Sequence, residues 1–314
     1  MENLVNSSPL ILVLVFLVIG FAFLMKGADF FVEGSSSIAK RLKVPPIIIG
    51  LTIVAMGTSL PETAVSVTAS LVNNNELAVS NVVGSNIFNL MVVVGVCSIL
   101  TPILVQKETI KRDIPFSMIC AFLLLGLGIL AVGDKSGMTL GHLDGMILLG
   151  FFAGYIVAMI QSAMKARAAG KNVEIEGIEE LEEEIGILSW PKSILFIVGG
   201  ALAIAFGGDL TVDAASRIAI DLGMSQTLVG LTIVSIGTSL PELVTSVVAA
   251  RKNEVDMALG NAIGSNIFNI LPVPGPISKT LLLIFFFKSF SFNNSVQSPS
   301  VKSYFPILSC LLAC

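Results

Sequence analysis

Two glutamates stand inside long apolar stretches of this chain, Glu62 and Glu242. Each one ends the same six-residue motif, Gly-Thr-Ser-Leu-Pro-Glu. No Lys or Arg lies within ten residues of Glu62, and Arg251 lies near the far end of the stretch that holds Glu242. A carboxylate at the centre of a bilayer costs at least about 2.5 kcal/mol. A glutamate neutralised by a proton or by a basic residue is the alternative, but the matched pair favours a functional site.

The residues around each glutamate carry further oxygen atoms. A proline just before the glutamate has no N–H, so it kinks the helix and leaves a carbonyl one turn earlier unpaired. A threonine four residues before the glutamate shares its helix face, and a serine stands three residues before it. These residues are Thr58, Ser59 and Pro61 in the first copy and Thr238, Ser239 and Pro241 in the second. Carboxylate, hydroxyl and carbonyl oxygens are ligands for hard cations such as Ca²⁺ and Na⁺.

A second repeated block carries a polar stripe on one side of a predicted helix. Its polar residues recur every fourth position, which places them on one helix face. They are Asn81, Ser85 and Asn89 in the first copy and Asn261, Ser265 and Asn269 in the second. Hydrogen bonding between helices, without transport, would explain the stripe if it stood alone. Beside the paired glutamates, we interpret it as the facing wall of the same site.

Both blocks belong to an internal duplication with a constant offset of 180 residues. Eleven of thirteen positions are identical between residues 50–62 and 230–242. Five predicted spans separate equivalent points of the two copies. Because five is odd, the two halves must cross the membrane in opposite directions, as an inverted-topology repeat.

The composition indicates that membrane-spanning helices hold these residues. Of 314 residues, 54% are hydrophobic and 13% are charged, and the mean hydropathy is +0.91. An average soluble domain has about 25% charged residues. A soluble enzyme and a disordered chain are therefore excluded, and a net charge of −4 disfavours nucleic-acid binding. No nucleophile–base pair or cofactor motif indicates an enzyme. The predicted spans are 9–28, 44–72, 77–100, 114–132, 141–161, 190–208, 224–250 and 257–271.

The chain is predicted to be an all-α, multi-pass protein of the cell membrane, with its N-terminus outside. That orientation places twelve Lys and Arg residues in cytoplasmic connections and two on the outer side. The predicted organisation is a first repeat (1–164), an acidic cytoplasmic linker (165–189), a second repeat (190–271) and an atypical tail (272–314). The duplication breaks in this tail, so the second repeat is expected to be incomplete, through truncation, a frame error or a natural short variant.

The two repeated segments resemble those of the sodium/calcium exchanger family, of bacterial or archaeal type. The resemblance covers residues 1–271 and matches both repeats in order and spacing. It implies ten spans in two inverted halves of five, ion sites between the second, third, seventh and eighth spans, a monomer, and no cofactor. It further implies a switch in which the first and sixth helices slide across a fixed core.

Carried over by motif, the resemblance assigns ligands to each transported ion. For Ca²⁺ these are Thr58, Glu62, Thr238 and Glu242, and the two glutamates balance the charge of the metal ion. For Na⁺ these are Ser59, Ser85, Ser239, Ser265 and the carbonyls of Ala55 and Ser235. Asn89 and Asn269 line the centre of the site, and well-studied relatives carry an aspartate in place of Asn269.

The function predicted from the sequence is a secondary antiporter that exchanges Na⁺ for Ca²⁺ by alternating access. A Ca²⁺/H⁺ antiporter is the nearest alternative, because buried glutamates can carry protons. The threonine and serine hydroxyls favour Na⁺ over a proton. A cation channel with glutamate rings is a further alternative, which inverted halves with broken helices disfavour.

Overall fold

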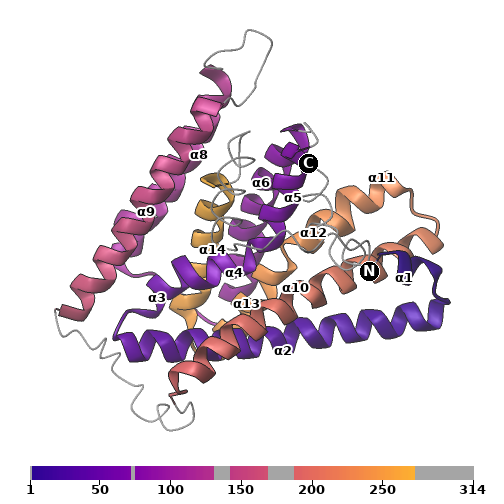
Figure 1. Cartoon of the computed structure of the whole chain (residues 1–314), viewed down its shortest axis with the longest axis horizontal. Helices are drawn as coiled ribbons and strands as arrows, with labels where there is room; N and C mark the ends of the chain where they lie inside the picture. Colours follow the sequence, from indigo (N-terminus) through magenta and orange to yellow (C-terminus); the bar gives the residue numbers. More distant parts are fainter. Residues whose placement is uncertain (1, 72–74, 131–141, 169–186, 273–314) are drawn as a thin grey trace, which may run out of the picture.

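The computed structural model describes residues 2–71, 75–130, 142–168 and 187–272, and every regular element in these ranges is helical (Figure 1). The predicted tail beyond residue 272 and most of the acidic linker lie outside the described residues. The first repeat contains α1 (Glu2–Ser7), α2 (Leu10–Leu42), α3 (Pro46–Ile49), η1 (Gly50–Val54), α4 (Ala55–Thr58), α5 (Leu60–Leu71), α6 (Asn75–Phe88), η2 (Asn89–Val93), α7 (Val94–Leu100), η3 (Thr109–Asp113), α8 (Ile114–Leu130) and α9 (His142–Ala168). The second contains α10 (Trp190–Asp221), α11 (Gln226–Val229), η4 (Gly230–Val234), α12 (Ser235–Thr238), α13 (Leu240–Arg251) and α14 (Val255–Ile270).

The long helices α2 and α10 pack side by side along the lower part of the molecule (Figure 1). Glycines allow their backbones to approach closely. A Cβ on Gly27 would lie 3.0 Å from the Gly200 carbonyl oxygen, and a Cβ on Gly207 would lie 2.7 Å from that of Gly20. Gly20 and Gly200, like Gly27 and Gly207, are equivalent positions of the duplication. The contacts are therefore reciprocal and the two helices antiparallel, so the predicted inverted repeat is confirmed.

Equivalent turns end these two helices. Lys43 and Gly223, which are 180 residues apart, both have left-handed backbone, with φ of 54° and 92°. The Lys43 N–H donates to carbonyls of the last turn of α2. Pro45 and Pro46 follow, and proline cannot continue a helix because it has no N–H.

The next span of each repeat is broken where the proline motif predicted a kink. Pro46–Thr58 and Leu60–Val67 meet at 48°, and Thr232–Thr238 and Leu240–Arg251 meet at 51°. A π-helical turn precedes each break, η1 in the first repeat and η4 in the second. The motif predicted the bend but not the π-turns, which widen the helix next to the site.

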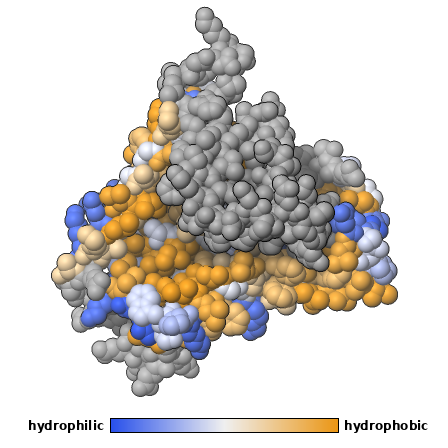
Figure 2. All heavy atoms as spheres, viewed as in Figure 1, coloured by the Kyte–Doolittle hydropathy of each residue, from blue (hydrophilic) through white to orange (hydrophobic). Residues whose placement is uncertain are grey.

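Seven of the eight predicted spans have the length and apolar composition of membrane-crossing helices, when each bent pair counts as one span. The eighth is α14, whose sixteen residues reach about 24 Å, short of a bilayer core. Every residue from Met257 to Leu271 is buried, because α14 lies at the centre of the molecule against η1, α3, α4 and α13. The outer surface along the long helices is hydrophobic, with hydrophilic residues mainly at the edges (Figure 2).

The helices α8 and α9 form a pair that projects to one side of the molecule (Figure 1). Their side chains bridge them, since the rings of Phe116 and Tyr155 stack with centroids 5.2 Å apart. Phe152 of α9 packs edge-on against Phe268 of α14, with centroids 5.1 Å apart. The pair is thereby attached to the central helices.

Candidate cation site

The two glutamates lie at equivalent places, in the first turns of α5 and α13, directly after the two helix breaks. Both are buried, with exposures of 1% for Glu62 and 0% for Glu242. The breaks centre on Ser59 and Ser239, whose ψ angles of 8° and 6° lie outside the helical region. Because a helix N-terminus carries partial positive charge, it stabilises a carboxylate there.

Each glutamate is bound by the serine of the opposite repeat. Ser59 Oγ donates to Glu242 Oε1 at 2.8 Å, and Ser239 Oγ donates to Glu62 Oε1 at 3.1 Å. The site therefore lies on the pseudo-two-fold axis, where both halves of the chain contribute to it.

An asparagine braces each glutamate from the neighbouring helix. Asn81 Nδ2 donates to the Glu62 carbonyl oxygen at 3.2 Å and to Ser66 Oγ at 2.9 Å. Asn261 Nδ2 makes the same pair of bonds in the second repeat, to the Glu242 carbonyl oxygen at 3.4 Å and to Ser246 at 2.9 Å. These asparagines hold the helix that carries the glutamate rather than its carboxylate.

Four other asparagines link the two repeats to each other. Asn89 Nδ2 donates to Asn266 Oδ1 at 3.1 Å, and Asn269 Nδ2 donates to Asn86 Oδ1 at 3.2 Å. Asn86 and Asn266 each donate in turn to the other's backbone carbonyl, at 3.2 and 3.4 Å. The polar stripe predicted from the sequence, with its spacing of four residues, did not include Asn86 or Asn266. The sequence did hold a signal for these two residues. They stand three residues before Asn89 and Asn269, and this spacing places them on an adjoining part of the same helix face.

Four buried carboxylate and amide oxygens of these glutamates and asparagines have no hydrogen-bond partner within the described ranges. They are Glu62 Oε2, Glu242 Oε2, Asn89 Oδ1 and Asn269 Oδ1. Buried polar atoms normally have partners, and an exception calls for a ligand or another specific cause. Neither glutamate takes part in any ion pair among the described residues. The arrangement supplies carboxylate and amide oxygens with lone pairs available to a cation.

The remaining predicted ligands divide into a buried set and a more exposed set. In the first repeat, Ala55 and Thr58 are fully buried, and Thr58 Oγ1 lies 3.0 Å from Asn261 Oδ1 and 3.4 Å from Ser265 Oγ. In the second, Ser235 is exposed and Thr238 is partly exposed, with its hydroxyl 3.2 Å from the Ser235 carbonyl. Ser85 is buried like Ser265.

Comparison with known proteins identifies the family of the chain. The sequence profile described as "Sodium/calcium exchanger protein" matches residues 12–161 and 192–314. The chain belongs to the sodium/calcium exchanger family. This family member is therefore an integral membrane transporter that exchanges cations, with Ca²⁺ among them.

Individual relatives of this exchanger cover most of its length. The "Putative antiporter CaxA" of Alkalimonas amylolytica is 42% identical over 265 residues, which are 83% of this chain and 78% of that protein. The "Sodium/calcium exchanger MaX1" of Methanosarcina acetivorans is 35% identical over 299 residues, 86% and 85% of the two chains. A solved structure of the sodium-calcium exchanger NCX_Mj, soaked with 2.5 mM Na⁺ and 10 mM Sr²⁺, superposes with a TM-score of 0.69 at 30% identity, over 90% and 92% of the chains.

Proposed function

We propose that this exchanger moves Ca²⁺ against Na⁺ through the site between Glu62 and Glu242. The observation that carries the proposal is a pair of buried carboxylates, each bound by the serine of the other repeat. Each has one oxygen without a hydrogen-bond partner and no ion pair among the described residues. Two like charges repel in a medium of low dielectric constant, so a cation between them stabilises the site. Within the described part of the chain, no three Asp, Glu, His or Cys residues gather, so these two glutamates supply the negative charge.

Two negative charges balance one Ca²⁺ and leave Asn89 and Asn269 as neutral ligands. The four unpartnered oxygens surround this ion, and the serine hydroxyls beside them suit Na⁺ when it replaces Ca²⁺. In this proposal Thr58 and Thr238 complete the Ca²⁺ shell. Ser59, Ser85, Ser239, Ser265 and the carbonyls of Ala55 and Ser235 belong to the Na⁺ shells.

The two repeats differ in a way that supports alternating access. On one side, α14 packs against η1 so closely that a Cβ on Gly264 would lie 2.8 Å from the Leu51 carbonyl oxygen. On the equivalent side, a Cβ on Gly84 of α6 would have no neighbour within 4 Å. With the N-terminus outside, the closed contact faces the cytoplasm and the looser one faces outward. An exchange of these two packings would open the site to the other side.

The driving force favours an exchange of several Na⁺ for each Ca²⁺. A tenfold gradient supplies about 1.4 kcal/mol per ion, and 100 mV supplies about 2.3 kcal/mol per charge. If three Na⁺ replace one Ca²⁺, the total of about 6.5 kcal/mol sustains a Ca²⁺ gradient of about four to five decades. An exchange of one Na⁺ for one Ca²⁺ could not sustain such a gradient.

The first test is the ion dependence of transport by the full chain in proteoliposomes. We expect ⁴⁵Ca²⁺ uptake to require an outward Na⁺ gradient and to respond to the membrane potential, because a net charge moves in each cycle. Equal uptake driven by a proton gradient in Na⁺-free buffer would assign the protein to the Ca²⁺/H⁺ alternative. Uptake that neither saturates nor depends on a counter-ion would indicate a channel.

The two cross-repeat serines should tune ion affinity without being essential. Ser59→Ala and Ser239→Ala each remove a hydrogen bond to a buried carboxylate, a loss of about 1.5–3 kcal/mol. We expect the half-saturating Na⁺ concentration to rise by about tenfold or more in both variants. Ser98→Ala is the control, because the exposed Ser98 hydroxyl bonds only within its own helix, to Val94 O at 2.7 Å. A normal Na⁺ dependence in both site variants would remove the serines from the Na⁺ shell.

A further inference from the structure

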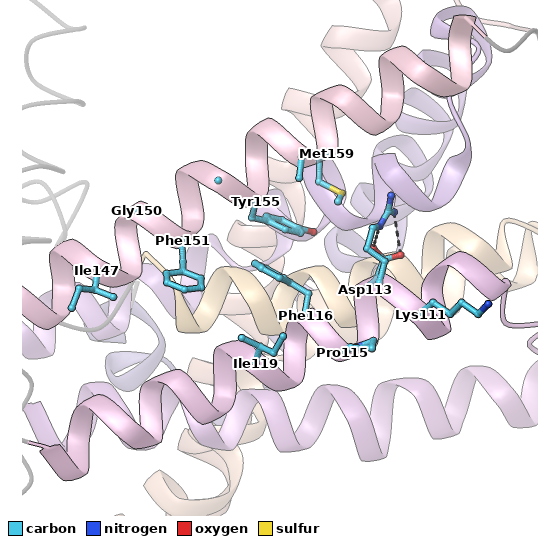
Figure 3. Close-up of a pocket in the computed structure, with 13 residues that line it drawn as sticks. Lys111, Asp113, Pro115, Phe116, Ile119, Ile147, Gly150, Phe151, Tyr155 and Met159 are labelled. Carbon is cyan, nitrogen blue, oxygen red and sulfur yellow. Dashed lines mark hydrogen bonds and ion pairs between the residues drawn. The ribbon is translucent and has the colours of Figure 1, made fainter.

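A large groove between α8 and α9 is separate from the cation site. Its volume is about 770 Å³, and most of its lining is apolar. Phe116 and Ile119 line it from α8, and Ile147, Phe151 and Tyr155 line it from α9 (Figure 3). This helix pair projects to one side of the molecule (Figure 1).

Glycines on α9 create the hollow. Gly150, Gly154 and Ala158 recur every fourth residue, so they form one strip along the helix face toward the groove. A Cβ added at Gly150 or Gly154 would meet no atom within 4 Å. The space beside these glycines is therefore not filled by packing between the two helices.

Basic residues stand at one end of the groove, and the opposite end at Ile147 is apolar (Figure 3). Arg112 is already neutralised, because its Nε lies 2.6 Å from Asp113 Oδ1 and its Nη1 donates to Ser162 Oγ at 2.8 Å. Lys111 is exposed and has no ion pair among the described residues. The groove thus combines one unbalanced positive charge at its mouth with an apolar interior.

We propose that the groove binds a phospholipid with an anionic headgroup. Its phosphate lies at Lys111, and its acyl chains lie along the glycine strip. The proposed orientation of the chain places this end at the cytoplasmic membrane surface, where lipid headgroups reside. Acyl chains gain little by leaving a bilayer that is equally apolar, so the charge at Lys111 provides the selectivity.

The floor of the groove is connected to the cation site. Tyr155 Oη donates to the Leu51 carbonyl oxygen of η1 at 3.0 Å, and its ring stacks on Phe116 within the groove. The turn η1 leads directly into α4 and its residue Thr58. A lipid in the groove therefore rests against the side chain that holds the π-turn of the broken span.

Native mass spectrometry of the delipidated full chain, with phosphatidylglycerol and phosphatidylcholine in equal amounts, tests the proposal. We expect the chain with one bound lipid to carry phosphatidylglycerol about five to ten times as often as phosphatidylcholine. This ratio is the effect of one lysine at a membrane surface. Lys111→Gln should abolish this preference. Gly154→Leu should remove both lipids from the site, because leucine fills the groove without displacing a neighbour.

Two matched variants serve as controls. Lys192→Gln removes an exposed lysine from the start of α10, and Gly199→Leu adds a side chain to an exposed glycine with no neighbour within 4 Å. Both should bind lipid as the unaltered chain does. Equal binding of the two lipids by the unaltered chain, or retention of lipid by Gly154→Leu, would overturn the proposal. The proposal would also be overturned if the unaltered chain formed a dimer that Gly154→Leu converts to monomers, since the groove would then hold a second copy of the chain. These readouts do not depend on which cations are exchanged.

Discussion

Glu62→Gln and Glu242→Gln should each lower the apparent Ca²⁺ affinity by about a hundredfold or more and abolish transport at low Ca²⁺ concentrations. Glutamine keeps the shape of the side chain and removes one of the two charges at the centre of the site. A divalent cation that has lost its water then faces a single negative charge, which compensates its desolvation poorly. The loss of one member of a buried charge pair costs about 2–5 kcal/mol.

The measurement is ⁴⁵Ca²⁺ flux over a range of Ca²⁺ concentrations, normalised to the amount of protein in the vesicles. Glu108→Gln is the matched control, because Glu108 is exposed at the start of η3 and carries the same charge. Transport by this control should equal that of the unaltered chain. Unchanged Ca²⁺ affinity in Glu62→Gln would contradict a site in which both carboxylates bind the ion.

The second large effect is expected where α2 and α10 cross. Gly200→Ala places a Cβ 2.7 Å from both the Gly27 carbonyl oxygen and the Phe31 nitrogen. These are backbone atoms, so the two helices must separate by several tenths of an ångström along their contact. Overpacking of this kind costs about 1–3 kcal/mol, and sometimes more. We expect a lower melting temperature in detergent and a strongly reduced transport rate.

Gly199→Ala provides a control one residue away in the same helix. Gly199 is exposed, and a Cβ there would have no neighbour within 4 Å. Both substitutions raise helix propensity by the same amount, so the difference between them isolates the contact between α2 and α10. If Gly200→Ala melted and transported like Gly199→Ala, the close packing of these helices would not matter to either property.

The sequence alone determined the membrane class, the inverted repeat and the place of the two helix breaks. Each of these depends on local or periodic features. Apolar length predicts a span, a proline predicts a break within four residues, and an odd number of spans inverts the second copy. The same logic predicted that Thr58 and Glu62 share a helix face, but in the structure the break separates them, with Thr58 at the end of α4 and Glu62 at the start of α5.

Only the tertiary structure decided which residues meet across the axis. The bond from Ser59 to Glu242 joins residues 183 positions apart, and Asn89 meets Asn266 over 177 positions. No spacing within one helix predicts such pairs, because they depend on how two antiparallel copies dock. The pairing of Asn86 with Asn266 also depends on docking. A helical wheel places each of them beside the polar stripe, but only the docking of the two repeats brings them into contact. The difference between buried Thr58 and partly exposed Thr238 also has no counterpart in the motif, since identical sequences lie in two unequal packings.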